Sequence, residues 1–234
     1  MIYLTLVRNH TTCYLLNTGV KYMKIGIIGA GVVGRAIGKL ATRVGHQVML
    51  SNSRGPKSLF SLPYAIGCQV GAVDEAVAFG DIVIVAIPLF AYRSVPVASL
   101  AGKIVIDVNN YYPDRDGRIA ELDEQRITTS ELLAHHLPSA RVVKAFNAIT
   151  MTDLETDGLP ANAIDRRALP IAGDDEESKA TVAALLDEFG FDVVDTGPLS
   201  EGWRFERGRP TYCVRLNIKE LTAMLTDIVQ LSAN

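Results

Sequence analysis

Short apolar runs alternate with amphipathic stretches along most of the chain. Lys24–Ile28 reads as a buried strand that ends in a glycine-rich turn, and one apolar face predicts a helix from about Val32 to Val44. Similar apolar runs predict further strands over 47–50, 68–70, 81–87, 103–108, 141–146, 168–172 and 191–194. Strands separated by helical stretches are typical of an α/β protein with a doubly wound parallel sheet.

Helix-start signals divide the regions between these strands. Thr128-x-x-Glu131 has the spacing of a capping box, and Asp174-x-x-Glu177 predicts the start of a second helix. A short helix is expected over 74–79, and the charged stretch 111–126 reads as an exposed loop. These signals place helices between the strands, as a doubly wound sheet requires.

The C-terminal part predicts a small helical extension to this sheet. A long helix is expected from Thr211 to Leu231, with an apolar seam at spacings of four and three, formed by Val214, Ile218, Leu221, Leu225 and Ile228. Such a seam packs either inside its own subunit or against a second copy of the chain in a homodimer.

The glycine-rich turn after the first strand carries the strongest functional signal. Gly29 permits the tight turn, Gly31 lets the backbone approach a pyrophosphate, and Gly34 lets helix and strand pack closely. Ala30, Val32 and Val33 complete the Gly-x-Gly-x-x-Gly stretch, which leads straight into a helix N-terminus that favours phosphate. The order strand, turn, helix predicts a Rossmann-like dinucleotide-binding fold.

The residues after the second strand indicate which dinucleotide binds. NAD-binding versions place an Asp or Glu about 20 residues after the glycines, whereas here no carboxylate occurs until Asp74. Ser53 and Arg54 stand there instead, and a guanidinium suits a 2′-phosphate. We therefore expect NADP(H), although Arg54 can also be an ordinary surface residue in a turn.

Composition narrows the classes of partner. The chain has 234 residues, a net charge of −3 and no basic run, so neither nucleic acid nor an anionic membrane is expected as a partner. Three separated cysteines and four histidines form neither a disulfide framework nor a metal motif. We expect a cytoplasmic protein without a metal site.

Three regions are expected along the chain. Residues 1–22 precede the first strand of the fold and read as an extension outside the core, with Met23 as the natural start. Residues 23–150 are expected to form the dinucleotide-binding domain, and residues 151–234 a smaller substrate or packing region.

The carboxyl ends of the predicted strands should meet where a ligand binds. Those ends supply small apolar and amide groups, namely Ala86, Ile87, Pro88, Asn109 and Asn147. No hydrolytic triad, cysteine nucleophile or carboxylate pair falls there, and we can assign no catalytic residue. Apolar and amide groups can instead hold a nicotinamide ring against a redox partner.

Five separated motifs resemble one family. They are the glycine turn of 26–34, Ser-Asn-Ser-Arg-Gly-Pro at 51–56, Val-Val-Lys-Ala-Phe-Asn at 142–147, Gly-Asp-Asp-Glu-Glu-Ser-Lys at 173–179 and Asp-Thr-Gly-Pro-Leu at 195–199. Together they resemble the NADPH-dependent coenzyme F420 reductases from about Lys24 onward. The resemblance implies hydride transfer between the nicotinamide C4 and the C5 of a deazaflavin.

The resemblance also implies site residues. Gly29, Gly31 and Gly34 would cradle the pyrophosphate, and Ser53 and Arg54 would hold the 2′-phosphate. A nicotinamide ring would be lined by Ala86, Ile87, Pro88 and Asn109. Well-defined deazaflavin reductases often carry a Thr-Gly-Asn type of turn, whereas this chain has Ala-Gly-Val-Val at 30–33.

The electron acceptor stays open at this point. Trp203 could stack on a flavin-like ring, with Arg204 or Arg207 facing its phosphate tail, or Trp203 could instead anchor a domain junction. The acceptor could be a deazaflavin, an ordinary flavin or another small molecule, with Asn147 also a candidate contact. Two other functions are considered: an imine or keto-acid reductase of the pyrroline-carboxylate reductase type, and a non-catalytic NADPH-sensing module.

Overall fold

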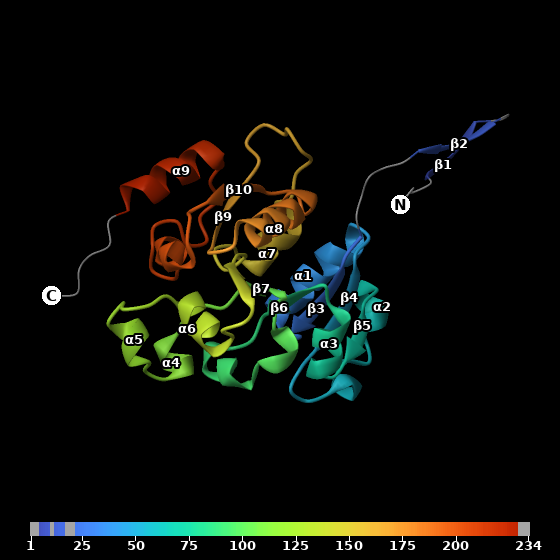
Figure 1. The fold of residues 1–234 in the computed structure, drawn as a ribbon. Coiled ribbons are helices and arrows are strands. Elements are labelled where there is room, and N and C mark those ends of the chain that lie inside the picture. The colour runs from blue at the N-terminus through green and yellow to red at the C-terminus, as the bar shows by residue number, and fades with distance from the viewer. Residues whose placement is uncertain (1–4, 10–11, 17–21, 229–234) are drawn as a thin grey trace.

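A central sheet of eight strands organises the protein. The computed structural model describes residues 5–9, 12–16 and 22–228 (Figure 1). The strand order in the sheet is β10-β9-β8-β7-β6-β3-β4-β5. In chain order these strands are β3 (Lys24–Ile28), β4 (Gln47–Ser51), β5 (Gln69–Gly71), β6 (Ile82–Val85), β7 (Ile104–Asp107), β8 (Arg141–Lys144), β9 (Ala168–Gly173) and β10 (Asp192–Asp195). The predicted α/β, Rossmann-like class is confirmed.

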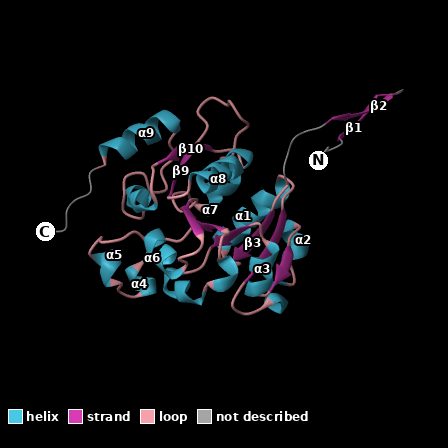
Figure 2. Ribbon diagram, in the orientation of Figure 1, coloured by secondary structure: helices cyan, strands magenta, loops and turns pink. Residues whose placement is uncertain are grey.

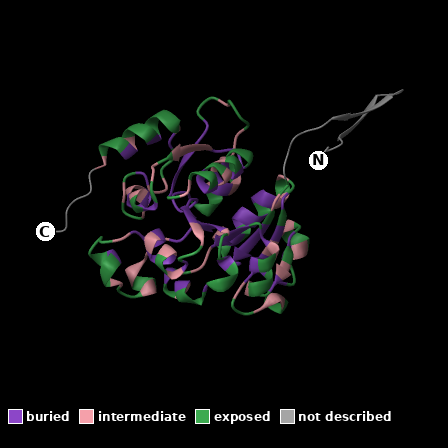
Figure 3. Cartoon of the chain, viewed as in Figure 1, coloured by how far each residue is buried: buried purple, intermediate pink, exposed green. Residues whose placement is uncertain are grey.

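Alternating side chains of the strands face two helical layers. In β6, Ile82 and Ile84 belong to one hydrophobic cluster, whereas Val83 and Val85 belong to another. The first cluster includes residues of α1 (Val32–Arg43), α7 (Met151–Thr156) and α8 (Glu176–Glu188). The second includes residues of α3 (Val73–Phe79), α6 (Thr129–His136) and the 3-10 segments η2 (Leu89–Ser94) and η3 (Ala98–Leu100). The inner strands are buried between helices whose outer surfaces are exposed, whereas the edge strand β10 is half-buried (Figures 2 and 3).

One strand pair departs from the predicted all-parallel sheet. β9 pairs with β8 in the antiparallel sense, with Lys144 opposite Ala172, while β10 runs parallel to β9. Apolar patterning predicts that a strand is buried but does not encode its direction, so this reversal could not be predicted from the residues alone.

The structure corrects one predicted helix start and confirms another. The side chain that caps α8 is Asp175 rather than Asp174, because Asp175 accepts a hydrogen bond from the Ser178 N–H at 2.8 Å. Asp174 instead accepts one from the Leu199 N–H. The predicted capping box of α6 is confirmed, with reciprocal bonds between Thr128 and Glu131.

The predicted helix 211–231 is wrong at its start and at its end, since Ile228 is already extended. The described helix is α9 (Ile218–Asp227), which Asn217 caps, and residues 229–231 lie outside the described residues. Cys213 has a φ of 57°, a left-handed conformation that a helix cannot continue through. Of the predicted seam, Leu221 and Leu225 are buried in a third cluster with Phe205. These two therefore pack within the subunit.

Short elements complete the fold. The stretch 111–126, predicted as a loop, contains two single-turn helices, α4 (Pro113–Asp116) and α5 (Ala120–Asp123). The remaining elements are η1 (Pro56–Leu59), α2 (Leu62–Ile66), η4 (Leu199–Phe205) and a hairpin of β1 (Thr5–Asn9) and β2 (Thr12–Leu16). The hairpin falls in the predicted extension 1–22, of which residues 1–4, 10–11 and 17–21 lie outside the described residues. The predicted division into domains stays a prediction.

Candidate functional site

The glycine turn between β3 and α1 is shaped by close backbone contacts. Gly29 has a φ of 113°, and a Cβ there would lie 2.1 Å from the carbonyl oxygen of Ala86. A Cβ on Gly34 would lie 2.0 Å from the carbonyl oxygen of Gly29. Gly31 is different, because its Cβ would meet nothing within 4 Å. Two glycines are thus required by packing, and Gly31 borders open space.

The start of α1 faces this open space without a side-chain cap. Gly31 is the N-cap residue, no acidic residue lies in the first turn, and Val32 is 61% exposed. Arg35 donates from Nε to the Ala30 carbonyl oxygen at 2.8 Å, which ties the helix to the turn, and Val33 packs against the hydrophobic core. A helix N-terminus of this kind is suited to an anion.

A cleft of about 360 Å³ opens at this turn. Its lining residues are Ile28, Gly29, Ala30, Gly31, Asn52, Ser53, Arg54, Val73, Ala86, Ile87, Pro88, Phe90, Ala91 and Ser94. Three predicted residues of the turn, Gly29, Ala30 and Gly31, therefore share one cleft with the Ser53–Arg54 pair and the Ala86–Pro88 segment. The other predicted cofactor residues, Val32, Val33, Gly34 and Asn109, are not among its lining residues. Among the lining residues there is no carboxylate, and Arg54 carries the single charge.

The loop after β4 presents Ser53 and Arg54 from a fixed turn. Asn52 Oδ1 accepts hydrogen bonds from the Arg54 N–H at 3.1 Å and from Ser58 Oγ at 3.3 Å. Ser51 is buried and donates from Oγ to the Ile27 carbonyl oxygen. The Ser53 and Arg54 side chains are exposed. Arg54 makes no ion pair with any described residue, so its guanidinium can receive an anion.

Asn109 lies directly behind the Ile87 wall of the cleft. Its Oδ1 accepts a hydrogen bond from the Ile87 N–H at 3.2 Å, which fixes the orientation of the amide. Asn109 is 4% exposed, and its Nδ2 has no partner among the described residues. A buried donor without an acceptor is costly, so this amide is a candidate donor to a ligand bound beside Ile87.

Asn147 does not line the cleft but joins the strand ends beside it. Its Nδ2 donates to the Phe205 carbonyl oxygen at 3.0 Å and to Asn110 Oδ1 at 3.3 Å, and Asn110 Nδ2 donates back to the Asn147 carbonyl oxygen. Its own Oδ1 is buried and has no partner among the described residues. Asn147 therefore bridges the ends of β7 and β8 to η4.

A buried polar network at the same strand ends was missed from the sequence. Asp107 and Lys144 end β7 and β8, lie opposite each other in register, and have no exposed surface. Ser130 donates from Oγ to Asp107 at 2.6 Å, and Lys144 Nζ lies 3.4 Å from Glu206 Oε1. Burial raises the pKa of Asp107, while Lys144 and Ser130 act to lower it. The sequence signal that could have revealed this network is the charged residue, Asp107 or Lys144, directly after the apolar residues of each strand.

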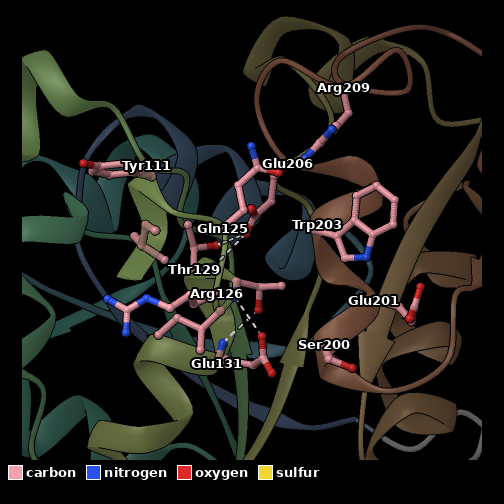
Figure 4. Close-up of a pocket in the computed structure, with 13 residues that line it drawn as sticks. Tyr111, Gln125, Arg126, Thr129, Glu131, Ser200, Glu201, Trp203, Glu206 and Arg209 are labelled. Atoms are coloured by element: carbon pink, nitrogen blue, oxygen red, sulfur yellow. Dashed lines mark hydrogen bonds between the residues drawn. The ribbon is translucent and has the colours of Figure 1, made fainter. Parts of the chain in front are cut away.

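Trp203 lines a different cavity from the cleft, and Arg204 is among the lining residues of neither. Figure 4 shows this cavity, of about 320 Å³, with Trp203, Glu206 and Arg209 on its walls. Trp203 is 8% exposed, and the guanidinium carbons of Arg204 and Arg209 lie 4.8 and 4.9 Å from its ring. Arg204 also pairs with Glu201 and donates to the carbonyl oxygens of Leu225 and Ile228. In this geometry, the predicted stacking of Trp203 on a flavin would require these guanidinium groups to move.

The described residues contain neither a metal-binding cluster nor a membrane-spanning helix. Within the described residues, no group of three or more His, Cys, Asp or Glu side chains could hold a metal ion. No helix in the same part of the chain is long and apolar enough to cross a bilayer. The predicted cytoplasmic location and homodimer stay predictions.

The segment that lines this cleft is similar to a known family of proteins. Residues 24–111 match the family model described as NADP oxidoreductase coenzyme F420-dependent, which confirms the predicted resemblance for this segment. The chain is 32% identical over 185 residues to the metalloreductase STEAP3 of Rattus norvegicus, covering 78% of this chain and 36% of STEAP3. The chain thus spans about a third of the length of that curated relative.

Solved structures extend the similarity beyond the matched segment. The hypothetical protein SMa0349 of Sinorhizobium meliloti is 28% identical, with a TM-score of 0.73 and coverage of 86% of this chain and 97% of that chain. A protein of Arthrobacter sp. FB24, whose name is that of an F420-dependent NADP reductase, is 24% identical, with a TM-score of 0.67 and coverage of 77% and 87%. The second likeness shows the fold alone.

Proposed function

Because residues 24–111 carry the signature of the coenzyme F420-dependent NADP oxidoreductases, we propose that this chain is an NADPH-dependent oxidoreductase. It transfers hydride between NADP(H) and a flavin-like or deazaflavin acceptor. The observation that carries the proposal is the cleft at the glycine turn, in which Arg54 is the single charged lining residue and no carboxylate opposes a 2′-phosphate. The residues from 23 to 150 form the cofactor-binding part, and those from 151 onward contribute to the acceptor side.

The residues present fit NADP(H) at three points. The open space at Gly31, beside an uncapped helix N-terminus, accommodates a pyrophosphate. Ser53 and Arg54 receive the 2′-phosphate. Asn109 Nδ2, the buried donor without a partner among the described residues, would be the group that donates to the carboxamide of the nicotinamide.

The chemistry requires little of the protein beyond orientation. The bound nicotinamide supplies the hydride, while the Ala86–Pro88 wall excludes water from one side of the ring. Phe90, also in the lining, is 57% exposed and offers an apolar surface at the mouth of the cleft. With a redox ring as acceptor, neither a strong acid nor a nucleophile is needed next to the transferred hydride.

The test is a turnover assay with a binding control. The purified chain is mixed with NADPH or NADH and with FMN, riboflavin or coenzyme F420, and absorbance at the nicotinamide band is followed. We expect NADPH-dependent reduction of at least one of these rings. Gly31→Val fills the open space and should abolish cofactor binding, whereas Ala180→Val adds the same side chain on an exposed face of α8 and should not.

The other outcomes separate the alternatives. Turnover of cyclic imines but not of flavins would favour the pyrroline-carboxylate reductase type. Tight NADPH binding without turnover of any acceptor would favour a sensing module. Full NADPH binding by Gly31→Val would show that the turn is not the cofactor site.

A further inference from the structure

Two buried charges end the neighbouring strands β7 and β8. Asp107 and Lys144 are paired in register and neither has exposed surface. Lys144 Nζ donates to Thr129 Oγ1 at 2.6 Å and to Ser130 Oγ at 3.2 Å. Ser130 passes a hydrogen bond on to Asp107 Oδ2. The two charges are therefore joined through hydroxyls at the start of α6.

The network is closed on its other side by η4. Glu206 Oε1 lies 3.4 Å from Lys144 Nζ and accepts hydrogen bonds from the Thr129 N–H and Oγ1 (Figure 4 shows Thr129 with Glu206). A Cβ on Gly202 would lie 2.9 Å from Lys144 Cδ. The missing side chain of Gly202 lets η4 pack closely on Lys144. This packing shields the lysine side chain from water.

Both main-chain groups of Asn109 are held by these two charges. The Asn109 N–H donates to Asp107 Oδ1 at 3.0 Å, and Lys144 Nζ lies 3.5 Å from the Asn109 carbonyl oxygen. The side-chain Oδ1 is occupied by the Ile87 N–H. Asn109 is thus fixed at three atoms. Its Nδ2, which has no hydrogen-bond partner among the described residues, is the polar atom that remains for a ligand.

Stability alone does not explain such an arrangement. Taking charged groups out of water is costly, and well-packed apolar residues in place of a buried ion pair are often neutral or stabilising. Arg166 shows that the chain also buries a cation elsewhere, where it pairs with Asp187 and Asp192. None of those three residues lines the cleft, so this second cluster provides a structural comparison.

We propose that Lys144 and Asp107 are positioning residues that hold the Asn109 amide in place for the nicotinamide end of the cofactor. This inference rests on the proposed function, because it requires NADP(H) in the cleft. The two charges act through Asn109 and touch no substrate themselves. Their effect should therefore be confined to the nicotinamide end and should not extend to the Arg54 end.

The experiment compares Lys144→Met with Arg166→Met, which removes a buried cation from the second cluster. Dissociation constants are measured for NADPH and for 2′,5′-ADP, which has the adenine and 2′-phosphate end but no nicotinamide. Lys144→Met should weaken NADPH on the order of tenfold, the equivalent of one well-formed hydrogen bond, and leave 2′,5′-ADP unchanged. Arg166→Met should change neither constant at a temperature where both variants are folded.

A double-mutant cycle tests whether Lys144 acts through Asn109. In an Asn109→Ala background, Lys144→Met should weaken NADPH little further, because the group that it positions is gone. Ser130→Ala removes the hydroxyl between the two charges and supplies a milder variant if Lys144→Met fails to fold. It should also weaken NADPH selectively.

The outcomes distinguish this inference from the proposed function. Equal weakening of NADPH and 2′,5′-ADP, or additive effects of Asn109→Ala and Lys144→Met, would overturn the positioning role while cofactor binding stands. If the wild-type chain binds neither NADPH nor 2′,5′-ADP, the proposed function itself fails, and this inference with it.

Discussion

The proposed preference for NADPH over NADH depends on Arg54. Its side chain is exposed at one end of the cleft, and it makes no ion pair with any described residue. Arg54→Ala removes a guanidinium that would meet the 2′-phosphate, a group that NADH lacks. The variant should therefore weaken NADPH and leave NADH nearly unchanged.

The magnitude follows from the exposure of the contact. Hydrogen bonds to a charged group contribute about 1.5–3 kcal/mol. Because the guanidinium is exposed and partly screened by salt, the lower end of that range applies. About 1.5 kcal/mol corresponds to roughly a tenfold rise in the dissociation constant for NADPH. Arg54→Lys, which keeps the charge but not the planar fork, should fall between wild type and Arg54→Ala.

The assay is a fluorescence titration of each reduced cofactor at low and high salt. The wild-type advantage for NADPH should shrink as salt is raised, and Arg54→Ala should show little salt dependence. Arg43→Ala, at the exposed C-terminal end of α1 and outside the cleft lining, is the control and should match wild type. Equal weakening of NADPH and NADH by Arg54→Ala would refute the specificity argument.

Two further predictions concern folding. Gly29→Ala should lower the free energy of unfolding by about 2 kcal/mol or more in a denaturant titration, because φ is 113° and the new Cβ would lie 2.1 Å from the Ala86 carbonyl oxygen. Gly208→Ala, with a φ of 87° but nothing within 4 Å, should cost less, and equal losses would contradict the steric argument. Hydrogen bonds from the Ser178 hydroxyl and main chain hold the pKa of Asp175 below its ordinary value of 3.8. Its stabilising contribution is therefore complete above that value and is lost as pH falls through the lower folded-state pKa. Asp175→Asn keeps a capping oxygen but cannot titrate, so its thermal midpoint should fall less on acidification than that of wild type, and parallel midpoint curves would contradict this linkage.

Local patterns in the sequence were sufficient to predict the proposed cofactor-binding end of the site. The glycine turn, the strand before it and the helix after it lie close together in the chain, and the structure places them as one unit with Gly31 beside open space. The absence of a carboxylate after β4 is equally local. The spacing of Thr128 and Glu131 predicted a capping box, because both bonds form within one turn. Asn217 and Glu220 have the same spacing and could have been found in the same way.

Contacts between segments far apart in the sequence decided the direction of β9 and the surroundings of Trp203. The direction of β9 depends on how the chain returns after β8, which apolar periodicity does not encode. Trp203 is enclosed by two guanidinium groups, one of them from Arg209, a contact that residue type alone does not reveal.

The sequence by itself thus predicted where a dinucleotide would lie, since that prediction depends only on a glycine-rich backbone and one short-range turn. Only the tertiary structure decided how Asn109 is held, because Asp107, Lys144 and Glu206 come from three separate segments. In the sequence, a charged residue such as Asp107 or Lys144 only interrupts an apolar strand pattern. Its role becomes visible once the fold brings its hydrogen-bonding partners next to it. Low-dielectric burial then makes those partners obligatory.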